Sequence, residues 1–357
     1  MQTTVVPGRA LSTKHLEAWS ELQDADLALA SPFLCPEFTV AVAAARDDIN
    51  VAILEEGGEK VGFFPFQRGR FSIGYPVGGP LNDLQGVIVR PDLDWDAMDL
   101  IRRCGLIAWD FGRLLACQKP FESTHRRRHI SALIDVSKGY KAYVEERRLA
   151  GTEQVKKTES LARKLDRENG PLRFELHTSE ERHLATLMKW KFDRYSAEGY
   201  EDLFAIPWIR QVMKRIHATQ RANFGGVLSV LYAGKELAAA HMGIRSRRIW
   251  HYWFPAYNPK YARYSPGLIL LLKMVQHSST LGPDIIELGG PSDYLYKQRL
   301  MNSEIDLAEG TIERPSLANL ARRVGRASKE WIRRSRLLYP PVRSVVRALR
   351  RITHSSP

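Results

Sequence analysis

The chain has 357 residues, of which 44% are hydrophobic, enough apolar material for one large domain or two ordinary ones. The N-terminus has no basic segment followed by an apolar one, and no stretch reaches the ~18 uninterrupted apolar residues of a membrane span. We therefore expect a cytoplasmic protein. The cysteines Cys35, Cys104 and Cys117 are far apart and form no CxxC pair, so neither a disulfide framework nor a zinc site is expected.

The formal net charge of +13 is concentrated at the C-terminus. From residue 313 to residue 357 twelve Lys/Arg stand against two Glu, a local charge of +10, which argues against a nucleic-acid binder along the whole chain. Apolar residues there recur every three or four positions, as in a helix that lies on a membrane surface: Leu317, Leu320, Val324, Ala327 and Trp331. Residues 316–357 are predicted to contact anionic lipid. The alternatives are a solvated tail and a tail that binds tRNA.

In the first half, apolar periodicity predicts helices over 14–28 and 37–46, followed by two strands joined by a Gly-Gly turn over 51–68. The segment 228–245, "LSVLYAGKELAAAHMGIR", has the same order of strand, Gly, charged pair and strand. This similarity suggests an internal duplication.

A charged segment over 140–174 has Leu and Ala at helical spacing and closes at Gly170-Pro171, so it predicts a connecting helix. Its charges are typical of a solvated face. The alternative is that the basic residues attract an anionic ligand: Lys156, Lys157, Arg163 and Lys164.

The second half predicts an alternation of helices and strands. The expected elements are helices over 180–198 and 207–222, a hairpin over 227–245, a strand over 248–257, helices over 265–280 and 293–301, and strands over 284–290 and 304–313. Helices between strands require crossover connections, so this half is predicted to be α/β with a mixed sheet.

The helix from 265 begins abruptly at Ser-Pro-Gly. We predict that the Ser265 hydroxyl caps it and that Pro266 occupies its first position. Gly267 weakens a first turn by roughly 1 kcal/mol relative to Ala unless something must approach the backbone there. The positive end of a helix dipole without a Cβ in the way is suited to a pyrophosphate.

This order of elements resembles the Gcn5-related N-acetyltransferase (GNAT) fold, in which the loop after the fourth strand binds the pyrophosphate of acyl-coenzyme A. Four segments resemble the CelD-like acetyltransferases of cellulose and exopolysaccharide biosynthesis: "SPFLCPEF" (31–38), "GFFPFQR" (62–68), "FPAYNPKYARYSPG" (254–267) and "IIELGGPSDYLYK" (285–297). The resemblance implies a mixed-sheet α/β acetyltransferase-like fold, expected as two tandem copies. The corresponding division is an N-terminal domain (1–140), a connecting helix (141–170), a C-terminal domain with the acyl-CoA site (171–312) and a basic amphipathic tail (313–357).

The phosphate loop departs from the usual GNAT pattern, because "ARYSPG" stands where (Arg/Gln)-x-x-Gly-x-(Gly/Ala) is common. On the resemblance, the expected coenzyme-binding residues are Tyr264, Ser265, Pro266, Gly267 and Leu268. The chain also resembles the Fem peptidyltransferases, which have two such domains and take aminoacyl-tRNA as donor. A tRNA donor is therefore an alternative to acyl-CoA (acetyl-CoA).

Acyl transfer needs an acceptor freed of its proton, a site for the developing oxyanion and an acid for the leaving thiolate. His241 and His251 lie in predicted strands, and an unperturbed histidine could relay a proton near neutral pH. Glu287, before two glycines, is a candidate base, and the resemblance implies an acid or cation at Tyr296 and Lys297. The alternatives are hydrogen-bonded histidines on a sheet, a solvated strand end at Glu287, and a surface helix that carries Tyr296 and Lys297. Asp83 is the only charge in the Gly/Pro-rich stretch "GYPVGGPLND" (74–83), whose backbone could line an acceptor cleft; for Trp190 and Tyr195, beside Lys191, core packing is expected.

The predicted function is transfer of an acyl group from acyl-CoA, without a metal, to an amine or hydroxyl of a sugar or envelope precursor. The alternatives are a Fem-like aminoacyl-tRNA-dependent transferase and an inactive acetyltransferase-like scaffold of a polysaccharide synthase.

Overall fold

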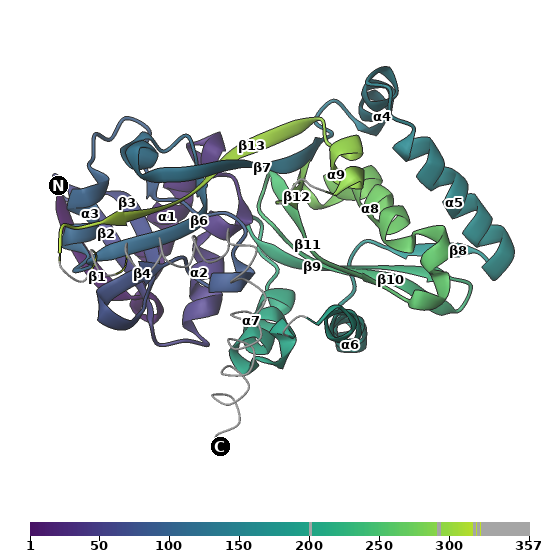
Figure 1. The fold of residues 1–357 in the computed structure, drawn as a ribbon, viewed down its shortest axis with the longest axis horizontal. Helices are drawn as coiled ribbons and strands as arrows, with labels where there is room; N and C mark the ends of the chain where they lie inside the picture. Colours follow the sequence, from purple (N-terminus) through teal and green to yellow (C-terminus); the bar gives the residue numbers. More distant parts are fainter. Residues whose placement is uncertain (200–201, 291–293, 317–318, 320–321, 323–357) are drawn as a thin grey trace, which may run out of the picture.

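The computed structural model describes residues 1–199, 202–290 and 294–316, together with Asn319 and Arg322. These residues form one continuous 13-stranded mixed sheet covered by helices (Figure 1). The strands are β1 Gln2–Pro7, β2 Ile49–Glu56, β3 Glu59–Arg68, β4 Ile73–Tyr75, β5 Ile88–Val89, β6 Ala108–Leu115, β7 His125–Asp135, β8 Leu172–Glu175, β9 Gly225–Ala233, β10 Glu236–Arg245, β11 Ile249–Tyr257, β12 Ile285–Gly289 and β13 Ser303–Glu313. The α-helices are α1 Thr13–Asp24, α2 Pro36–Ala43, α3 Ala97–Arg103, α4 Tyr140–Leu149, α5 Gln154–Asn169, α6 Glu181–Glu198, α7 Pro207–Ala218, α8 Pro266–His277 and α9 Leu295–Leu300.

The two halves of the chain repeat one pattern of strand pairing. In the first half β1, β2, β3 and β4 pair in that order, each antiparallel to the next, and β4 then pairs with β6 in parallel. In the second half β8, β9, β10 and β11 do the same, and β11 then pairs with β12 in parallel. The mixed α/β, GNAT-like fold expected from the sequence is confirmed, and the similar segments 51–68 and 228–245 occupy equivalent positions.

The last strand of each half lies in the sheet of the other half. β13 pairs with β6 and β7, whereas β7 pairs with β13 and β12, so the sheet order in the middle is β6-β13-β7-β12. Figure 1 shows β7 and β13 side by side, running across the join between the halves. The segments 1–140 and 171–312 therefore share one sheet, and their division into domains stays a prediction.

The helices of the second half cover both faces of its strands. In Figure 1, α6 and α7 lie below β9 and β10, and α5 and α8 lie above them. One buried cluster joins α6 and α7 to α1, α2 and the strands of both halves, and α2 contacts α7 directly. A second buried cluster lies under α5 and α8, and a third packs α3 against the first half of the sheet. The first cluster thus binds the two halves through side chains as well as through the sheet.

Most helices and strands predicted in the second half are present, with ends displaced by a few residues. The connecting helix is wrong as a single element: α4 and α5 are separate, because Gly151 has a φ of +77° that no helix accommodates. The basic face proposed on it falls on α5. In the first half, the sequence did not predict α3 or the strands β1, β4, β5, β6 and β7.

α8 begins at Pro266 after Ser265, as predicted, but the predicted cap by the Ser265 hydroxyl is wrong. Ser265 precedes the helix but has a left-handed backbone (φ 52°, ψ 54°), and its side chain makes no capping hydrogen bond. Instead its carbonyl accepts from the amides of Leu268 and Ile269 at 3.0 and 3.2 Å. Ser265 takes this conformation at the tight turn that joins the preceding 3-10 helix (Pro259–Tyr264) to α8.

Of the basic tail (313–357), residues 313–316, Asn319 and Arg322 are described, and Arg322 donates to Asp110 of β6 at 2.7 Å. The apolar residues on which the membrane prediction depends (Leu317, Leu320, Val324, Ala327 and Trp331) lie outside the described residues. Within the part of the chain that the structure describes, no helix is both long and apolar enough to cross a bilayer.

Candidate active site

Strands β11 and β12 pair over only three positions and then diverge. Their parallel register runs from Ile249–Ile285 through Trp250–Ile286 to His251–Glu287. Beyond that pair β11 continues to Tyr257, while the pairing of β12 with β7 is irregular between Glu287 and Gly289. Two predicted site residues therefore face each other at the point where the strands separate.

His251 lies between two carboxylates. Its Nε2 is 3.0 Å from Oδ2 of Asp83, and its Nδ1 is 3.1 Å from Oε2 of Glu287. The His251 and Glu287 side chains are 1% and 0% exposed, whereas Asp83 keeps 22% of its side-chain surface exposed. Asp83 comes from the first half of the chain, so the site is completed across the join between the halves.

Further polar groups surround these three side chains. Ser131 of β7 donates to Oε1 of Glu287 at 2.7 Å, and Arg113 of β6 lies 3.1 Å from Oδ1 of Asp83. The ammonium of Lys297, at the start of α9, donates to the carbonyl of Gly289 at 3.0 Å. We call His251, Asp83, Glu287, Ser131, Arg113 and Lys297 the buried charge network.

The charges of the network determine which of its groups are protonated. Burial alone lowers the pKa of His251, but Glu287 and Asp83 outweigh it and raise this pKa to about 9. Burial raises the pKa of Asp83, yet His251, Arg113 and Lys297 bring it below its ordinary value. Burial lowers the pKa of Lys297 to about 8, against the opposing effect of Asp83 and Glu287. At neutral pH His251 is therefore an imidazolium, which is a poor general base.

Packing holds the network in position. Phe33 packs edge-on against the His251 ring with centroids 4.8 Å apart, and the Trp253 indole donates to the carbonyl of Leu81 at 3.1 Å. Gly289 has a φ of +69°, and a Cβ there would lie 3.3 Å from Cε1 of His251, so glycine permits the close approach expected after Glu287. The segments 31–38 and 74–83 thus meet the second half at this site.

The other two candidate catalytic residues lie outside the network. His241 is buried and stacked on Tyr252 with ring centroids 4.5 Å apart, and its Nε2 accepts from the amide of Trp253 at 3.1 Å. Burial, and then the charge of His251, lower its pKa well below 6.5. These contacts suit a structural histidine. Tyr296 is half-buried, and burial raises its pKa to about 12, so it is a much weaker acid than Lys297.

The five predicted coenzyme-binding residues lie at the start of α8. Tyr264 is buried and donates to Glu168 of α5 at 2.6 Å, which anchors the loop before the helix. Pro266 is buried as well, and Leu268 packs on the second buried cluster. At Gly267 an added Cβ would meet one atom within 4 Å, Cδ1 of Tyr257 at 3.8 Å, so packing within the described chain does not require glycine there.

Arg113 and Ser131 were not predicted as site residues from the sequence. Asp83 stood out only as the single charge of a loop. The signal for Asp83 was its isolation in a Gly/Pro-rich stretch, which is typical of a residue held in a rigid turn. Asn82 fixes that turn by donating to the carbonyl of Val77 at 3.0 Å. Ser131 and Arg113 sit in strands that the sequence did not predict, and we find no local signal for them.

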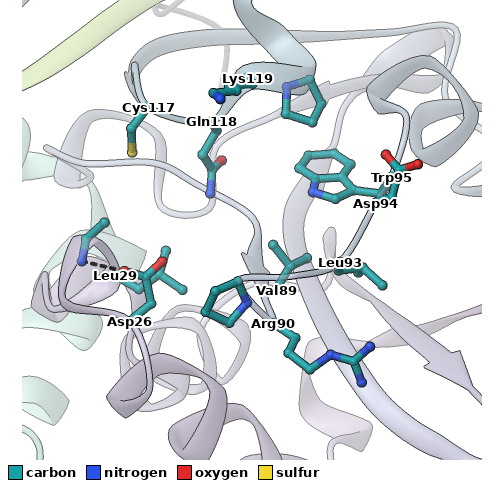
Figure 2. A pocket seen from close by; sticks show the side chains of 13 residues that line it. Asp26, Leu29, Val89, Arg90, Leu93, Asp94, Trp95, Cys117, Gln118 and Lys119 are labelled. Carbon is teal, nitrogen blue, oxygen red and sulfur yellow. Dashed lines mark hydrogen bonds between the residues drawn. The ribbon is translucent and has the colours of Figure 1, made fainter.

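Two cavities of about 400 Å³ each lie apart from the buried charge network. One, of about 390 Å³, is confined to the first half, where residues after α1, before α3 and after β6 line it (Figure 2). Its Arg90 is paired with Asp92 at 2.7 Å, and none of the predicted site residues lines it. The other, of about 400 Å³, lies between α6 and the end of β11, beyond the point where β11 and β12 diverge.

Comparison with known proteins agrees with this geometry. Residues 153–298 match the family model of the acetyltransferase (GNAT) domain. The structure of FemX is similar with a TM-score of 0.59 at 9% identity, over 91% of this chain and 100% of that one. The C-terminal domain of a protein named as a lysylphosphatidylglycerol synthetase, from Agrobacterium fabrum, is similar with a TM-score of 0.52 at 12% identity, over 88% and 95%. No curated protein matches. Residues 153–298 thus resemble a GNAT acetyltransferase domain, within a chain whose fold is similar to that of FemX.

Proposed function

We propose that this protein transfers an acyl group from acyl-coenzyme A to an amine or hydroxyl of a sugar or envelope precursor. The observation that carries the proposal is the divergence of β11 and β12 at the His251–Glu287 pair, beside the N-terminus of α8. Within the described residues no strand pairs with this edge of β11 beyond His251, so it can bind an extended ligand, and the helix terminus favours an anion. The match to the GNAT domain over 153–298 covers both features.

The donor fits the start of α8. The space beside Gly267 is open, so a pyrophosphate can approach the backbone at the positive end of the helix dipole. Pro266 at the first position fixes the helical backbone there, and the buried apolar face of α8 holds the helix in place. When bound there, acyl-CoA supplies the activated acyl group.

We assign separate roles to three members of the network. Lys297 is protonated at neutral pH and is the stronger acid beside the divergence, so it stabilises the developing oxyanion or protonates the leaving thiolate. Asp83 is partly exposed and can hold the acceptor amine or hydroxyl. His251, whose two ring nitrogens both face carboxylates, positions Asp83 and Glu287 rather than taking a proton.

The acceptor class follows from the resemblance to the CelD-like acetyltransferases. Two of the segments that carry it, 31–38 and 285–297, contribute Phe33, Glu287 and Lys297 to the site. This supports a shared site architecture, and from it we infer an acceptor in polysaccharide or envelope synthesis.

A Fem-like transferase that uses aminoacyl-tRNA is the second candidate, favoured by the similarity to FemX along nearly the whole of both chains. Purified protein is incubated with radiolabelled acetyl-CoA, with and without tRNA as competitor. Binding of acetyl-CoA that tRNA leaves unchanged supports the acyl-CoA proposal, whereas displacement by tRNA supports the Fem-like candidate. If neither acetyl-CoA nor tRNA binds, both candidate functions are contradicted and the inactive scaffold remains.

We also propose that the basic tail contacts anionic membrane. The support is its charge of +10 and its helical spacing of apolar residues. The full chain should sediment with vesicles of anionic lipid at low salt, and a chain ending at Arg322 should not. Equal sedimentation of the two would contradict the proposal, and loss of tRNA binding instead would favour the Fem-like candidate.

A further inference from the structure

Lys191 lines the cavity between α6 and β11 and has no counter-ion among the described residues. Pro255, Ala256 and Tyr257 form the β11 side of the cavity, Trp190 and Lys191 belong to its α6 side, and the loop before α8 closes one end. Tyr257 also lies next to Gly267, so the cavity adjoins the start of α8. At about 400 Å³ it is in the size range of small-molecule sites.

The other charged side chains along this face of α6 are paired with one another. Lys189 donates to Asp193 at 2.9 Å, and Arg194 donates to Glu198 at 2.9 Å. Each pair joins residues four apart on one helix and so cancels its own charge. Lys191 is the remaining charge on the cavity wall.

Lys191 is 9% exposed, and within the described residues no hydrogen bond or ion pair satisfies its ammonium. Its nearest aromatic contacts are the rings of Tyr195 and Phe254, whose centroids are 5.6 and 5.9 Å from Nζ. Lys191 lines the cavity, and its Nζ is not fully sealed from solvent. Burial, followed by the charge of Arg194, lowers its pKa to about 8. An ammonium in this position is costly to bury without an anion.

We propose that this cavity binds an anionic group, a phosphate or a carboxylate, whose charge Lys191 neutralises. The aromatic and proline side chains of the wall pack against the uncharged part of the same molecule. The site follows from the cavity and its unpaired ammonium. Only the identity of the molecule rests on the proposed function, because the anion belongs either to the phosphates of the donor or to an acidic acceptor.

The first experiment tests the anion site without any enzymatic reaction. The lysines of the intact protein are reductively ¹³C-methylated, and the NMR signal of Lys191 is assigned by its loss in Lys191→Arg. We expect this signal to titrate near pH 8 and its pKa to rise by about one unit with inorganic pyrophosphate, because a bound anion favours the charged form. The signal of Lys189, which is already paired, should not change. The proposal would be overturned if about 10 mM pyrophosphate left the pKa of Lys191 unchanged while the protein stayed folded.

The second experiment identifies the source of the anion. Calorimetric titration compares CoA with pantetheine, and glucosamine 1-phosphate with glucosamine, on wild type, Lys191→Met and the control Lys14→Met, an exposed position of α1 outside the cavity. We expect Lys191→Met to weaken one phosphate-bearing member about 10- to 30-fold, equivalent to roughly 1.4 to 2 kcal/mol, and to leave its neutral counterpart unchanged. If Lys191→Met weakens the binding of CoA, the site belongs to the donor. If it weakens the binding of glucosamine 1-phosphate, the site belongs to the acceptor. Equal losses within each pair, or no loss at all, would contradict the proposal. Pyrophosphate binding by a protein that transfers no acyl group would retain the anion site and reject the proposed function alone.

Discussion

At the scale of single residues, His251 is the centre of the site. A carboxylate lies within 3.1 Å of each of its ring nitrogens, and the ring is almost fully buried. A buried imidazole that faced water or an apolar side chain would stay neutral at pH 7, whereas this one is charged because two carboxylates surround it. The network is therefore a fixed arrangement of charges, and a proton leaves His251 only at high pH.

This arrangement predicts a pH-dependent stability. The folded-state pKa of His251 is raised to about 9 from 6.5, so the folded chain holds a proton that the unfolded chain releases, and stability falls as the pH rises through this range. Between pH 6.5 and 8 the loss should be on the order of 2 kcal/mol. Above pH 8 Lys297, whose pKa is lowered to about 8, contributes with the opposite sign.

Glu287→Gln should shift the NMR titration of His251 downward by about one unit or more and make stability less dependent on pH. Urea unfolding at several pH values should show wild type to be more stable by about 2–4 kcal/mol at pH 6.5, with a smaller difference at pH 8. Glu122→Gln, at a surface ion pair, is the control and should leave both unchanged. A His251 that titrates near 6.5 in wild type would contradict the network.

The proton donor can be tested with two neighbouring substitutions. Lys297→Met removes the cation with a pKa of about 8 and should lower kcat about 100-fold or more. Tyr296→Phe removes a phenol with a pKa of about 12, and its effect on kcat should be below about 10-fold. Release of free CoA from acetyl-CoA gives the rates. If Tyr296→Phe lowers kcat more than Lys297→Met does, the assignment of Lys297 as the acid is wrong.

At the scale of elements, α8 connects the divergent strand β11 to the proposed donor site. Its first turn is built from Ser265, Pro266 and Gly267, and its apolar face is buried. The left-handed conformation of Ser265 brings the chain sharply from the preceding 3-10 helix into α8. The abrupt start is thus made by the backbone of Ser265, without its hydroxyl, and Gly267 remains unexplained by packing alone.

This predicts separate effects of Gly267 on folding and on ligand binding. Gly267→Ala should fold as wild type does, because its Cβ has space, and Gly267→Glu should fold as well, since an acid suits the first turn. Gly267→Glu should nevertheless raise the Kd for acyl-CoA about 10- to 100-fold, or roughly 1.4 to 3 kcal/mol. Gly112→Ala, in open space on β6, is the matched control for Gly267→Ala. Wild-type affinity in folded Gly267→Glu would place the donor elsewhere.

The sequence predicts elements best where the pattern is local. β9, β10 and α8 have apolar runs bounded by Gly or Pro, and these elements are where the pattern indicates. The contacts of the site are not local: Asp83 meets His251 across 168 positions, and Ser131 meets Glu287 across 156. Each member therefore looks like an ordinary strand or loop residue until the fold brings them together. The hydroxyl cap at Ser265 was wrong because this residue joins the 3-10 helix Pro259–Tyr264 directly to α8 with a left-handed backbone, which residue type alone does not predict.

At the scale of the whole molecule, the exchange of β7 and β13 joins the halves and completes the site. β7 carries Ser131 to Glu287, and its neighbours on either side, β12 and β13, both come from the second half. The first half also supplies Asp83 and Arg113. No half contains the whole network, so the site needs both halves.

The exchange predicts that neither half folds alone. A fragment of residues 1–139 would leave both edges of β7 unpaired and β6 without β13, and residues 140–316 would leave β12 and β13 without β7. Each fragment should lack a cooperative urea transition, because exposed strand edges and an incomplete core favour aggregation. Mixed during refolding, the two should associate with a Kd below ~1 µM, since the interface contains several strands and a shared buried cluster. A chain ending at Arg322 keeps every described strand and should unfold cooperatively, which makes it the control for truncation. Cooperative unfolding of residues 1–139 alone would show that its strands pair among themselves in solution, and the site would then have to assemble without the exchange.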